Sequence, residues 1–482
     1  MNALARLFAG VLPAAAILAS VEARRPYECD ALAAYRQLPG LVLLPATAAE
    51  VARCLQICAR AGIPVVARGA GTGLSGGALP HPEGVLLVLA RLNRILALDP
   101  ARRQAVVEPG LRNLALSEAA APHGLYYAPD PSSQLACTLG GNVAENSGGV
   151  HCLKYGLTVH NVLGLKLLTM DGEPLSVGGA AWDAPGYDLP ALLCGSEGLL
   201  GVVVEITVRL LPLPPAVRLL LAGFPSVAAA GQAVAEIVGS GVVPAGLEMM
   251  DRLAIQVTED FCHAGYPRDA EAVLLCELDG EAAEVAEESA VVEGCLAAAG
   301  AYLVRAATGP EERRQLWLGR KSAFPALGRI APDYLCMDGT IPRRALPEVL
   351  ERIAALSAHY GLPVANVFHA GDGNLHPLIA YDINRPGDLE KAEALGRAVL
   401  SLAVAVGGTI TGEHGVGWEK LDAMCEQFGA AELACFHGVK AAFDPLGLLN
   451  PGKAIPTLHR CAELGAMHVH GGRLPHADLP RF

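Results

Sequence analysis

The chain has 482 residues, of which 52% are hydrophobic, and its formal net charge is −13. This length allows two or three domains with large cores, and the negative charge argues against nucleic-acid binding as the main function. No run of about 18 apolar residues lacks a polar interruption, so no transmembrane helix is expected. The 13 cysteines are scattered and include no C-x-x-C pair. This is typical of reduced thiols in a cytoplasmic protein and argues against a cysteine-bound iron–sulfur cluster in this chain.

Residues 1–35 are expected to form a leading helical segment. Residues 3–19 also resemble the apolar region of a secretory signal, but Pro13 and the single Arg6 argue against a signal. We therefore expect a packed helix at the start of the chain.

The next stretch is expected to run helix, strand, loop, strand. Thr47 and Glu50 have the spacing of a capping box, which predicts a helix that ends near Gly62. Residues 63–67 and 85–89 are apolar runs typical of strands. The loop between them is therefore bounded by strands on both sides.

This loop, Arg68–Gly77, contains five glycines. Glycine has no Cβ and tolerates positive φ, so a ligand can lie directly on the backbone, and successive N–H groups can bind an anion. Gly71, Gly73 and Gly76 match the G-x-G-x-x-G pattern, but Pro80 follows, and the helix that a Rossmann motif requires is excluded. A mobile glycine-rich turn is the alternative for this loop alone.

Two further glycine clusters follow, in the loop-like stretch 129–149 and in Gly195–Gly201. Three such clusters in one domain, each beside a strand, favour a large phosphorylated ligand, and FAD fits better than a mononucleotide. The elements expected around them are a strand at 104–110, a helix at 111–123, and strands at 162–170 and 201–211.

The proline-rich segment 211–215 is the best linker candidate, because the pattern changes after it. Expected strands at 218–223, 272–278, 301–306, 335–341, 363–369 and 376–381 alternate with expected helices at 226–239, 281–299, 310–328, 344–360 and 387–406. This pattern predicts a second α+β domain on an antiparallel sheet. The expected parts are a cofactor domain at 36–214, a second domain at 215–418, a helical closing segment at 419–456 that returns to the first domain, and a poorly ordered tail at 457–482.

The second domain holds the candidate chemistry. His369 and His376 flank an Asp-Gly and Gly-Asn turn, which can place both imidazoles on one face of a hairpin, and Glu413 could complete a divalent-metal site. Two histidines packed beside a turn is the alternative. His414 could act as a general base, and Arg320 could bind a carboxylate through its guanidinium.

Seven segments carry a resemblance to a known family, and together they span roughly residues 27 to 456. They are Arg68–Gly77, 129–149, Gly195–Gly201, Arg320–Pro325, His369–His376, Gly412–Gly417 and Asn450–Lys453. The chain resembles the FAD-linked 2-hydroxyacid oxidases and dehydrogenases, and the FAD subunits of glycolate oxidases are the most similar branch. The first three segments are similar to the FAD-binding domain of the vanillyl-alcohol-oxidase type, also called the PCMH type.

The resemblance implies an α+β protein. It has a PCMH-type FAD-binding domain of two α+β subdomains and an α+β cap domain whose antiparallel sheet is flanked by helices. It implies oxidation of a small 2-hydroxyacid, glycolate or D-lactate, with hydride passing to flavin N5. Arg320 would bind the substrate carboxylate, and His414 would take the hydroxyl proton. His369, His376 and Glu413 would hold a divalent metal, Zn or Mn.

The apolar Phe324 and weakly polar Cys336 disfavour a dicarboxylate substrate, and His81, in an apparent turn tip, leads us to expect non-covalent FAD. The implied cofactor-binding residues come from the three glycine clusters and the closing segment. They are Arg68, Gly69, Ala70, Gly71, Thr72, Gly73, Leu74, Ser75, Gly76, Pro129, Asp130, Ser133, Gly140, Gly141, Asn142, Ala144, Asn146, Gly148, Gly149, Gly195, Glu197, Gly198, Gly201, Val203 and Asn450.

Reduced flavin must pass its electrons on. Because this chain has no cysteine cluster pattern, we expect an iron–sulfur subunit, a second flavin-type subunit, a quinone or a cytochrome as partner. The expected location is the cytoplasm, or the inner face of the membrane through such partners. Two alternatives are a flavin-holding subunit without catalysis and a metal hydrolase built on His369 and His376, but the hydrolase leaves the glycine clusters unexplained.

Overall fold

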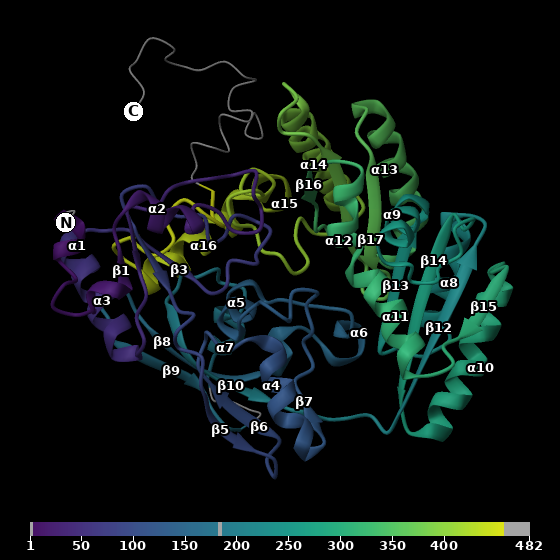
Figure 1. Cartoon of the computed structure of the whole chain (residues 1–482), viewed down its shortest axis with the longest axis horizontal. Helices are drawn as coiled ribbons and strands as arrows, with labels where there is room; N and C mark the ends of the chain where they lie inside the picture. Colours follow the sequence, from purple (N-terminus) through teal and green to yellow (C-terminus); the bar gives the residue numbers. More distant parts are fainter. Residues whose placement is uncertain (1–2, 182–185, 457–482) are drawn as a thin grey trace.

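The computed structural model describes residues 3–181 and 186–456. It contains a mixed N-terminal half and a C-terminal half built on one large sheet (Figure 1). Within the described residues, no helix is both long and apolar enough to cross a membrane.

A four-stranded sheet begins the first half. Its order is β1 (Ile17–Leu18), β2 (Leu41–Leu43), β4 (Val85–Val88) and β3 (Val65–Arg68). The helix α3 (Ala48–Ala61) joins β2 to β3, and the Thr47 hydroxyl accepts a hydrogen bond from the Glu50 N–H at its start. Gly62 ends α3 with a φ of 65°, as the sequence predicts.

The expected leading helix is wrong for residues 3–19. Helix is confined to α1 (Ala3–Arg6) there, a 3-10 turn η1 (Ala14–Ala16) follows, and α2 (Val21–Arg24) comes after β1. Pro13 cannot continue a helix, and Ile17 and Leu18 instead pair with Leu43 and Val42 of β2. Pairing in the sheet therefore overrides the apolar helical pattern.

A five-stranded antiparallel sheet completes the first half. Its order is β5 (Ile95–Asp99), β6 (Gln104–Val107), β10 (Val202–Arg209), β8 (Val162–Leu168) and β9 (Pro174–Gly178). Around it lie α4 (Asn113–Ala120), α6 (Cys152–Tyr155), α7 (Leu189–Leu193) and a small ribbon of β7 (Leu125–Tyr126) with β11 (Leu211–Pro212).

The stretch 129–149, expected to be loop-like throughout, contains the helix α5 (Leu139–Glu145). The Thr138 hydroxyl caps it by accepting from the Gly141 N–H at 3.3 Å, and Asn146 ends it with a φ of 53°. Its glycines lower helix propensity, and the cap and the packing of buried Leu139 and Val143 compensate.

The C-terminal half is a seven-stranded antiparallel sheet flanked by helices, as predicted. The strand order is β15 (Leu303–Ala306), β12 (Ala216–Phe224), β14 (Ala272–Gly280), β13 (Gly246–Asp251), β17 (Val364–His369), β18 (Asn374–Tyr381) and β16 (Asp333–Cys336). The helices are α8 (Val227–Gly239), α9 (Arg252–Cys262), α10 (Ala282–Ala298), α11 (Pro310–Lys321), α12 (Ala323–Ala326), α13 (Leu346–Tyr360) and α14 (Asp388–Ala405).

β13 and α9 were not predicted from the sequence, and the strand expected at 335–341 ends at Cys336. β13 lies at the centre of the sheet, between β14 and β17. Its position matters because Glu248 of β13 is paired in register with His369 of β17.

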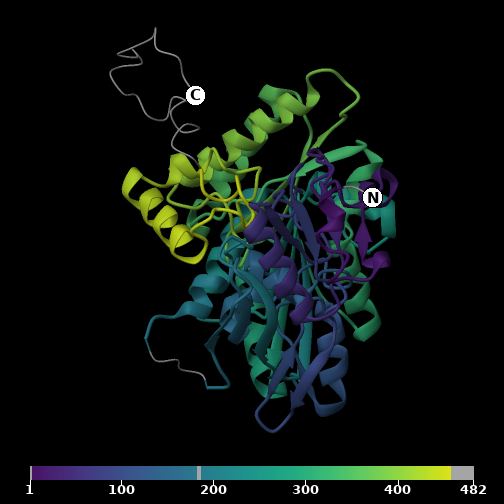
Figure 2. The same cartoon turned by 90° about the vertical axis from the view of Figure 1, so that its left-hand side faces the viewer.

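The closing segment 419–456 is only partly helical. It contains α15 (Met424–Gln427) and α16 (Ala430–Phe443), and α16 lies at the edge of the molecule in Figure 2. After α16 the chain returns to the first half, where Leu449 bridges to Val65 of β3 and Lys440 donates to the Leu199 carbonyl. The domain boundaries at 35, 214 and 418 stay predictions, and the predicted tail lies outside the described residues.

An ion-pair network joins the two halves. His151, just before α6, contacts Asp130 through Nδ1 at 2.9 Å and Glu277 of β14 through Nε2 at 3.1 Å. Lys154 and Tyr155 of α6 both bind the Asp279 carboxylate at 2.7 Å. Burial disfavours charging of the His151 imidazole, but the two carboxylates outweigh it and raise the pKa of His151 well above 6.5.

We expect His151→Gln to destabilise the protein by about 1–3 kcal/mol near neutral pH, because it removes charge-assisted hydrogen bonds between the halves. The folded pKa of His151 is higher than its unfolded value. Its contribution to stability is therefore complete below about pH 6.5 and is lost as the pH rises through the folded value. Melting temperatures of both proteins, measured at a series of pH values from acidic to alkaline, should differ by an amount that shrinks as the pH rises. The exposed His123→Gln is the control, and a difference independent of pH would contradict the charged bridge.

Candidate active site

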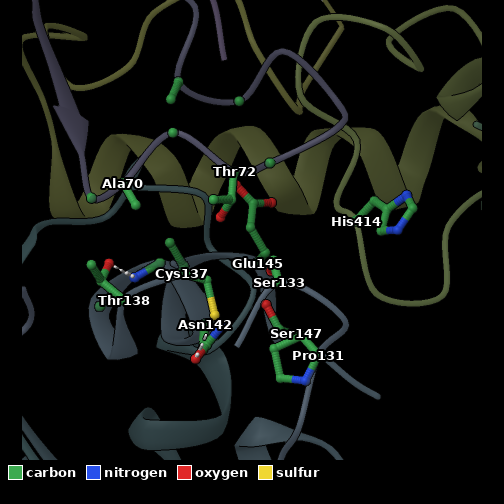
Figure 3. Close-up of a pocket in the computed structure, with 18 of the residues that line it drawn as sticks. Ala70, Thr72, Pro131, Ser133, Cys137, Thr138, Asn142, Glu145, Ser147 and His414 are labelled. Atoms are coloured by element: carbon green, nitrogen blue, oxygen red, sulfur yellow. Dashed lines mark hydrogen bonds between the residues drawn. The ribbon is translucent and has the colours of Figure 1, made fainter. Parts of the chain in front are cut away.

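A cavity of about 480 Å³ lies between the glycine clusters of the first half and the sheet of the second. In Figure 3, Ala70 and Thr72 lie on one side of it, Thr138 and Asn142 on the opposite side, and His414 at one end. The three glycine clusters thus line one continuous space.

The first two clusters approach each other closely, because a Cβ on Gly69 would lie 2.2 Å from the Thr138 hydroxyl. Within the first loop, a Cβ on Gly71 would lie 2.0 Å from the Arg68 guanidinium. Gly71 also has a φ of +73°. The glycines therefore allow close backbone contact and a conformation that other residues rarely adopt.

The backbone of the first loop has free donors. Among the described residues, no group accepts a hydrogen bond from the N–H groups of residues 70–74. Unpaired N–H groups on the wall of a cavity are suited to bind the oxygens of a phosphorylated ligand.

Most of the predicted cofactor-binding residues line this cavity. They are Arg68, Gly69, Ala70, Gly71, Thr72, Gly73, Leu74, Ser133, Gly140, Gly141, Asn142, Ala144, Glu197, Gly198, Gly201 and Val203. Other residues of the wall were not predicted individually, among them Pro109, Cys137, Thr138, Glu145, Ser147 and Tyr334. Cys137, Thr138, Glu145 and Ser147 belong to the predicted stretch 129–149, whereas Pro109 and Tyr334 lie outside the glycine clusters and reach the wall only through the fold.

The remaining predicted cofactor-binding residues lie outside the cavity wall: Ser75, Gly76, Pro129, Asp130, Asn146, Gly148, Gly149, Gly195 and Asn450. Several of them connect segments instead. Asp130 binds His151, and the Asn450 amide donates to the carbonyls of Gly77 and Glu197. A Cβ on Gly148 would lie 2.5 Å from Glu413 Oε2, so this glycine leaves room for that carboxylate.

The structure brings His369, His376 and Glu413 together. Val367 pairs with His376 across the β17–β18 hairpin, so His369, two residues further along β17, lies on the same face. The Nε2 atoms of His369 and His376 lie 3.3 and 3.0 Å from Glu413 Oε1, and both histidines are buried. Two imidazoles and a carboxylate facing one point are a ligand set that suits a divalent cation.

Glu248 is the residue that sequence analysis missed here. Its Oε1 lies 2.7 Å from His369 Nδ1, and its Oε2 lies 2.7 Å from Arg320 Nη2. A carboxylate on Nδ1 orients the ring and directs Nε2 toward a ligand. The available signal was an acidic residue within the apolar run Leu247–Met250.

His414 stacks on His376, with ring centroids 5.0 Å apart and planes 14° apart, and it lines the cavity. Burial lowers the pKa of His414 to about 4, against the opposing effect of Asp338. The imidazole is therefore neutral at pH 7 and has a lone pair that can accept a proton, while its lowered pKa makes it a weaker base than a free histidine. Its buried Nδ1 has no hydrogen-bond partner among the described residues.

Arg320 is not on the cavity wall. Its side chain is 1% exposed and ion-paired with Glu248, while its Nε has no acceptor among the described residues. The neighbouring Lys321 and Phe324 do line the cavity. The ring centroid of Phe324 lies 6.4 Å from that of His376, so an aromatic wall stands beside the histidines.

Two family models match the chain: an FAD binding domain over residues 39–178 and the C-terminal domain of FAD linked oxidases over residues 213–454. The chain belongs to the FAD-linked oxidases. The predicted family and α+β fold are thereby confirmed.

This FAD-linked oxidase is 62% identical to glycolate oxidase subunit GlcD of Escherichia coli K12 over 98% of the chain and 94% of that relative. It is 35% identical to a D-lactate dehydrogenase of Archaeoglobus fulgidus over 87% of the chain and 92% of the relative. A crystal structure of p-cresol methylhydroxylase with substrate bound shares the fold, with a TM-score of 0.79 at 16% identity, covering 94% of this chain and 96% of that one.

We expect Gly71→Ala to weaken FAD binding about tenfold, because a residue with a Cβ loses roughly 1–2 kcal/mol at positive φ and the loop must shift. Titration of the apoprotein with FAD, followed by flavin fluorescence, measures the change. Gly239→Ala is the matched control, since a Cβ there meets no atom within 4 Å. Equal affinity of both variants would contradict a cofactor site on this loop.

Proposed function

We propose that this FAD-linked oxidase oxidises a small 2-hydroxyacid, glycolate or D-lactate, to the 2-oxoacid. One observation carries the proposal: His376, Glu413 and His414 line the same cavity as the three glycine clusters of the FAD-binding half. The similarity to a glycolate oxidase subunit and to a D-lactate dehydrogenase supports this class of substrate.

The donors of the cavity fit FAD. Residues 70–74, whose N–H groups have no acceptor among the described residues, line the cavity, and glycines of all three clusters form part of its wall. We propose that FAD is held without a covalent bond, because His81 lies outside the cavity wall and its Nδ1 accepts a hydrogen bond from the Glu83 N–H. When bound, FAD supplies the two-electron acceptor at its N5 for hydride from C2 of the substrate.

His414 is the proposed base. It is neutral at pH 7, it lies on the cavity wall, and its Nδ1 is unpaired among the described residues. In this role the imidazole accepts the proton of the substrate hydroxyl as the C2–H bond breaks, so that the product is the neutral carbonyl. Its ring is kept in place by stacking on His376.

His369, His376 and Glu413 are the proposed ligands of a divalent metal, Zn or Mn. Glu248 would accept the Nδ1–H of His369 and so keep Nε2 free for the cation. A cation here would supply a Lewis acid that lowers the pKa of the substrate hydroxyl. Glu413 Oε1 lies within 3.3 Å of the Nε2 atoms of both histidines. A carboxylate in this position could ligate a cation together with the two imidazoles.

The cations at the end of α11 are the proposed partners of the substrate carboxylate. Arg320 keeps this role in the proposal because its buried Nε lacks an acceptor among the described residues, although its Nη2 is paired with Glu248. Lys321, on the cavity wall, is the alternative cation. Phe324 beside His376 favours a short substrate chain.

Electron transfer out of the flavin requires an acceptor. We propose an iron–sulfur or second flavin-type subunit, or a quinone or cytochrome, with this chain in the cytoplasm or bound to the inner face of the membrane through its partner. The relative at 62% identity is one subunit of a glycolate oxidase, which supports a multi-chain assembly.

The proposed reaction is tested by mixing the oxygen-free holoenzyme with single hydroxyacids and following the loss of oxidised-flavin absorbance. Glycolate or D-lactate should bleach the flavin, and 2-hydroxyglutarate should be slower, because the apolar Phe324 on the cavity wall offers no partner for a second carboxylate. After treatment with a chelator, the rate should fall at least about tenfold and return on addition of Zn²⁺ or Mn²⁺. If no hydroxyacid bleaches the flavin, the chain is a flavin-holding subunit and the proposal is wrong.

For the base, we expect His414→Ala to retain FAD and to lose about 10²-fold or more in the rate of flavin reduction, because the hydroxyl proton then has no acceptor. Rapid mixing gives this rate directly. The flavin of His81→Ala, which changes a half-buried histidine of the same half that lies outside the cavity wall, should be reduced at the normal rate. Near-normal reduction by His414→Ala would remove this residue from the mechanism.

A further inference from the structure

The turn Thr411–Gly417 carries both Glu413 and His414, yet it contains no helix or strand. The positions of the two side chains are therefore not fixed by hydrogen bonds of a regular helix or strand. The contacts that hold it come from other parts of the chain.

Asp338, just after β16, binds one side of the turn. Its carboxylate accepts from the N–H of Gly412 at 3.0 Å, of Glu413 at 3.2 Å and of His414 at 2.9 Å. The Thr411 hydroxyl donates to the same carboxylate at 2.6 Å. Three consecutive N–H groups converging on one carboxylate fix the backbone from which both functional side chains project.

Lys420 balances the charge of this carboxylate. Its Nζ lies 3.1 Å from Asp338 Oδ2, and both side chains are 0% exposed. The same ammonium group donates to the Gly415 carbonyl at 3.0 Å. Lys420 thus contacts both the carboxylate and the turn, and the buried negative charge is paired.

Glu197 binds the other side of the turn from the cofactor half. Its Oε1 and Oε2 accept from the N–H groups of Val416 and Gly417, each at 2.7 Å. Gly415 between the two carboxylates has a φ of +81°, and a Cβ there would lie 2.2 Å from Glu145 Oε2. The backbone of the turn is therefore hydrogen-bonded to one carboxylate from each half of the molecule, Asp338 and Glu197.

Asp338 also lies within 4.8 Å of potential ligand atoms of His376, Glu413 and His414. Its contacts are concentrated on Oδ2, which accepts from the Thr411 hydroxyl, the N–H groups of Gly412 and His414 and the Lys420 ammonium, while Oδ1 accepts only from the Glu413 N–H. These contacts bind the carboxylate to the turn, and rescue by added cation distinguishes a positioning role from a metal-ligand role.

We infer that Asp338, paired with Lys420, is a positioning residue that holds the turn bearing Glu413 and His414 in its working geometry. The inference rests on the proposed function for the roles of those two residues. Asp338 acts through the backbone of the turn and not on the substrate.

The test uses holoenzyme of Asp338→Asn, which keeps the size of the side chain but turns one acceptor oxygen into an NH₂ group facing N–H donors and an ammonium. Amide hydrogen exchange of the peptide that covers residues 411–417 should accelerate at least about tenfold, while the β17 peptide stays unchanged. FAD content should stay the same. Flavin reduction by the active hydroxyacid should slow about 100-fold, chiefly in the limiting rate, since small displacements of reacting groups have effects of this size.

Glu419→Gln is the matched control. This neighbouring carboxylate lies in a separate cavity that Lys420 and Arg397 also line, and its side-chain oxygens accept no hydrogen bond within the described part of the chain. The control therefore removes a carboxylate near Lys420 without removing a contact to the turn. It should change neither exchange of the turn nor flavin reduction. In Asp338→Asn the buried Lys420 ammonium loses its carboxylate partner. The double variant with Lys420→Met removes this unpaired charge as well. It should recover thermal stability without recovering the rate, and it replaces the single variant if that variant does not fold.

Three results would overturn the inference. They are unchanged exchange of the turn in Asp338→Asn, a reduction rate within about threefold of the parent in the double variant, or recovery of the rate by saturating Zn²⁺ or Mn²⁺, which would make Asp338 a metal ligand. The exchange measurement needs no substrate. If none of the hydroxyacids reduced the flavin of the parent protein, the proposed function would be wrong. The hydrogen-exchange measurement would still show whether Asp338 holds the turn.

Discussion

The site depends on one irregular turn, Thr411–Gly417, whose backbone N–H groups are hydrogen-bonded to two buried carboxylates. Asp338 binds the N–H groups of residues 412–414 from the second half, and Glu197 binds those of residues 416 and 417 from the first. A buried N–H without an acceptor costs free energy, so neither half can move independently without losing such contacts. The geometry of His414 is therefore a property of the assembled molecule.

The same principle explains the remaining contacts between the halves. The His151 bridge joins Asp130 to Glu277, and Asn450 joins the closing segment to the carbonyls of Gly77 and Glu197. Each of these polar groups is wholly or partly shielded from water, and each is satisfied by a segment distant in sequence. Together they fix the cavity between a glycine-lined wall and a wall that carries imidazoles and carboxylates.

Local chemistry explains which features could be predicted. The glycine loops, the N-cap at Thr47, and the hairpin that aligns His369 with His376 depend on neighbours within about ten residues. Two errors show the limit of this reasoning: the leading segment pairs as β1 instead of continuing a helix, and α5 forms within a glycine-rich stretch. In both, packing against distant residues outweighs local propensity.

The sequence by itself determined the family, the α+β class, the FAD-binding half and many of the residues that line the cavity, because glycine at fixed positions indicates a backbone that must lie close to a ligand. It proposed His369, His376, Glu413 and His414, and the fold places them together. Only the tertiary structure decided that Glu248 orients His369, that Arg320 lies behind the wall while Lys321 lines it, and that Asp338 holds the turn. These roles come from buried charges paired across strands and halves, and such pairings leave no periodic pattern in a single sequence.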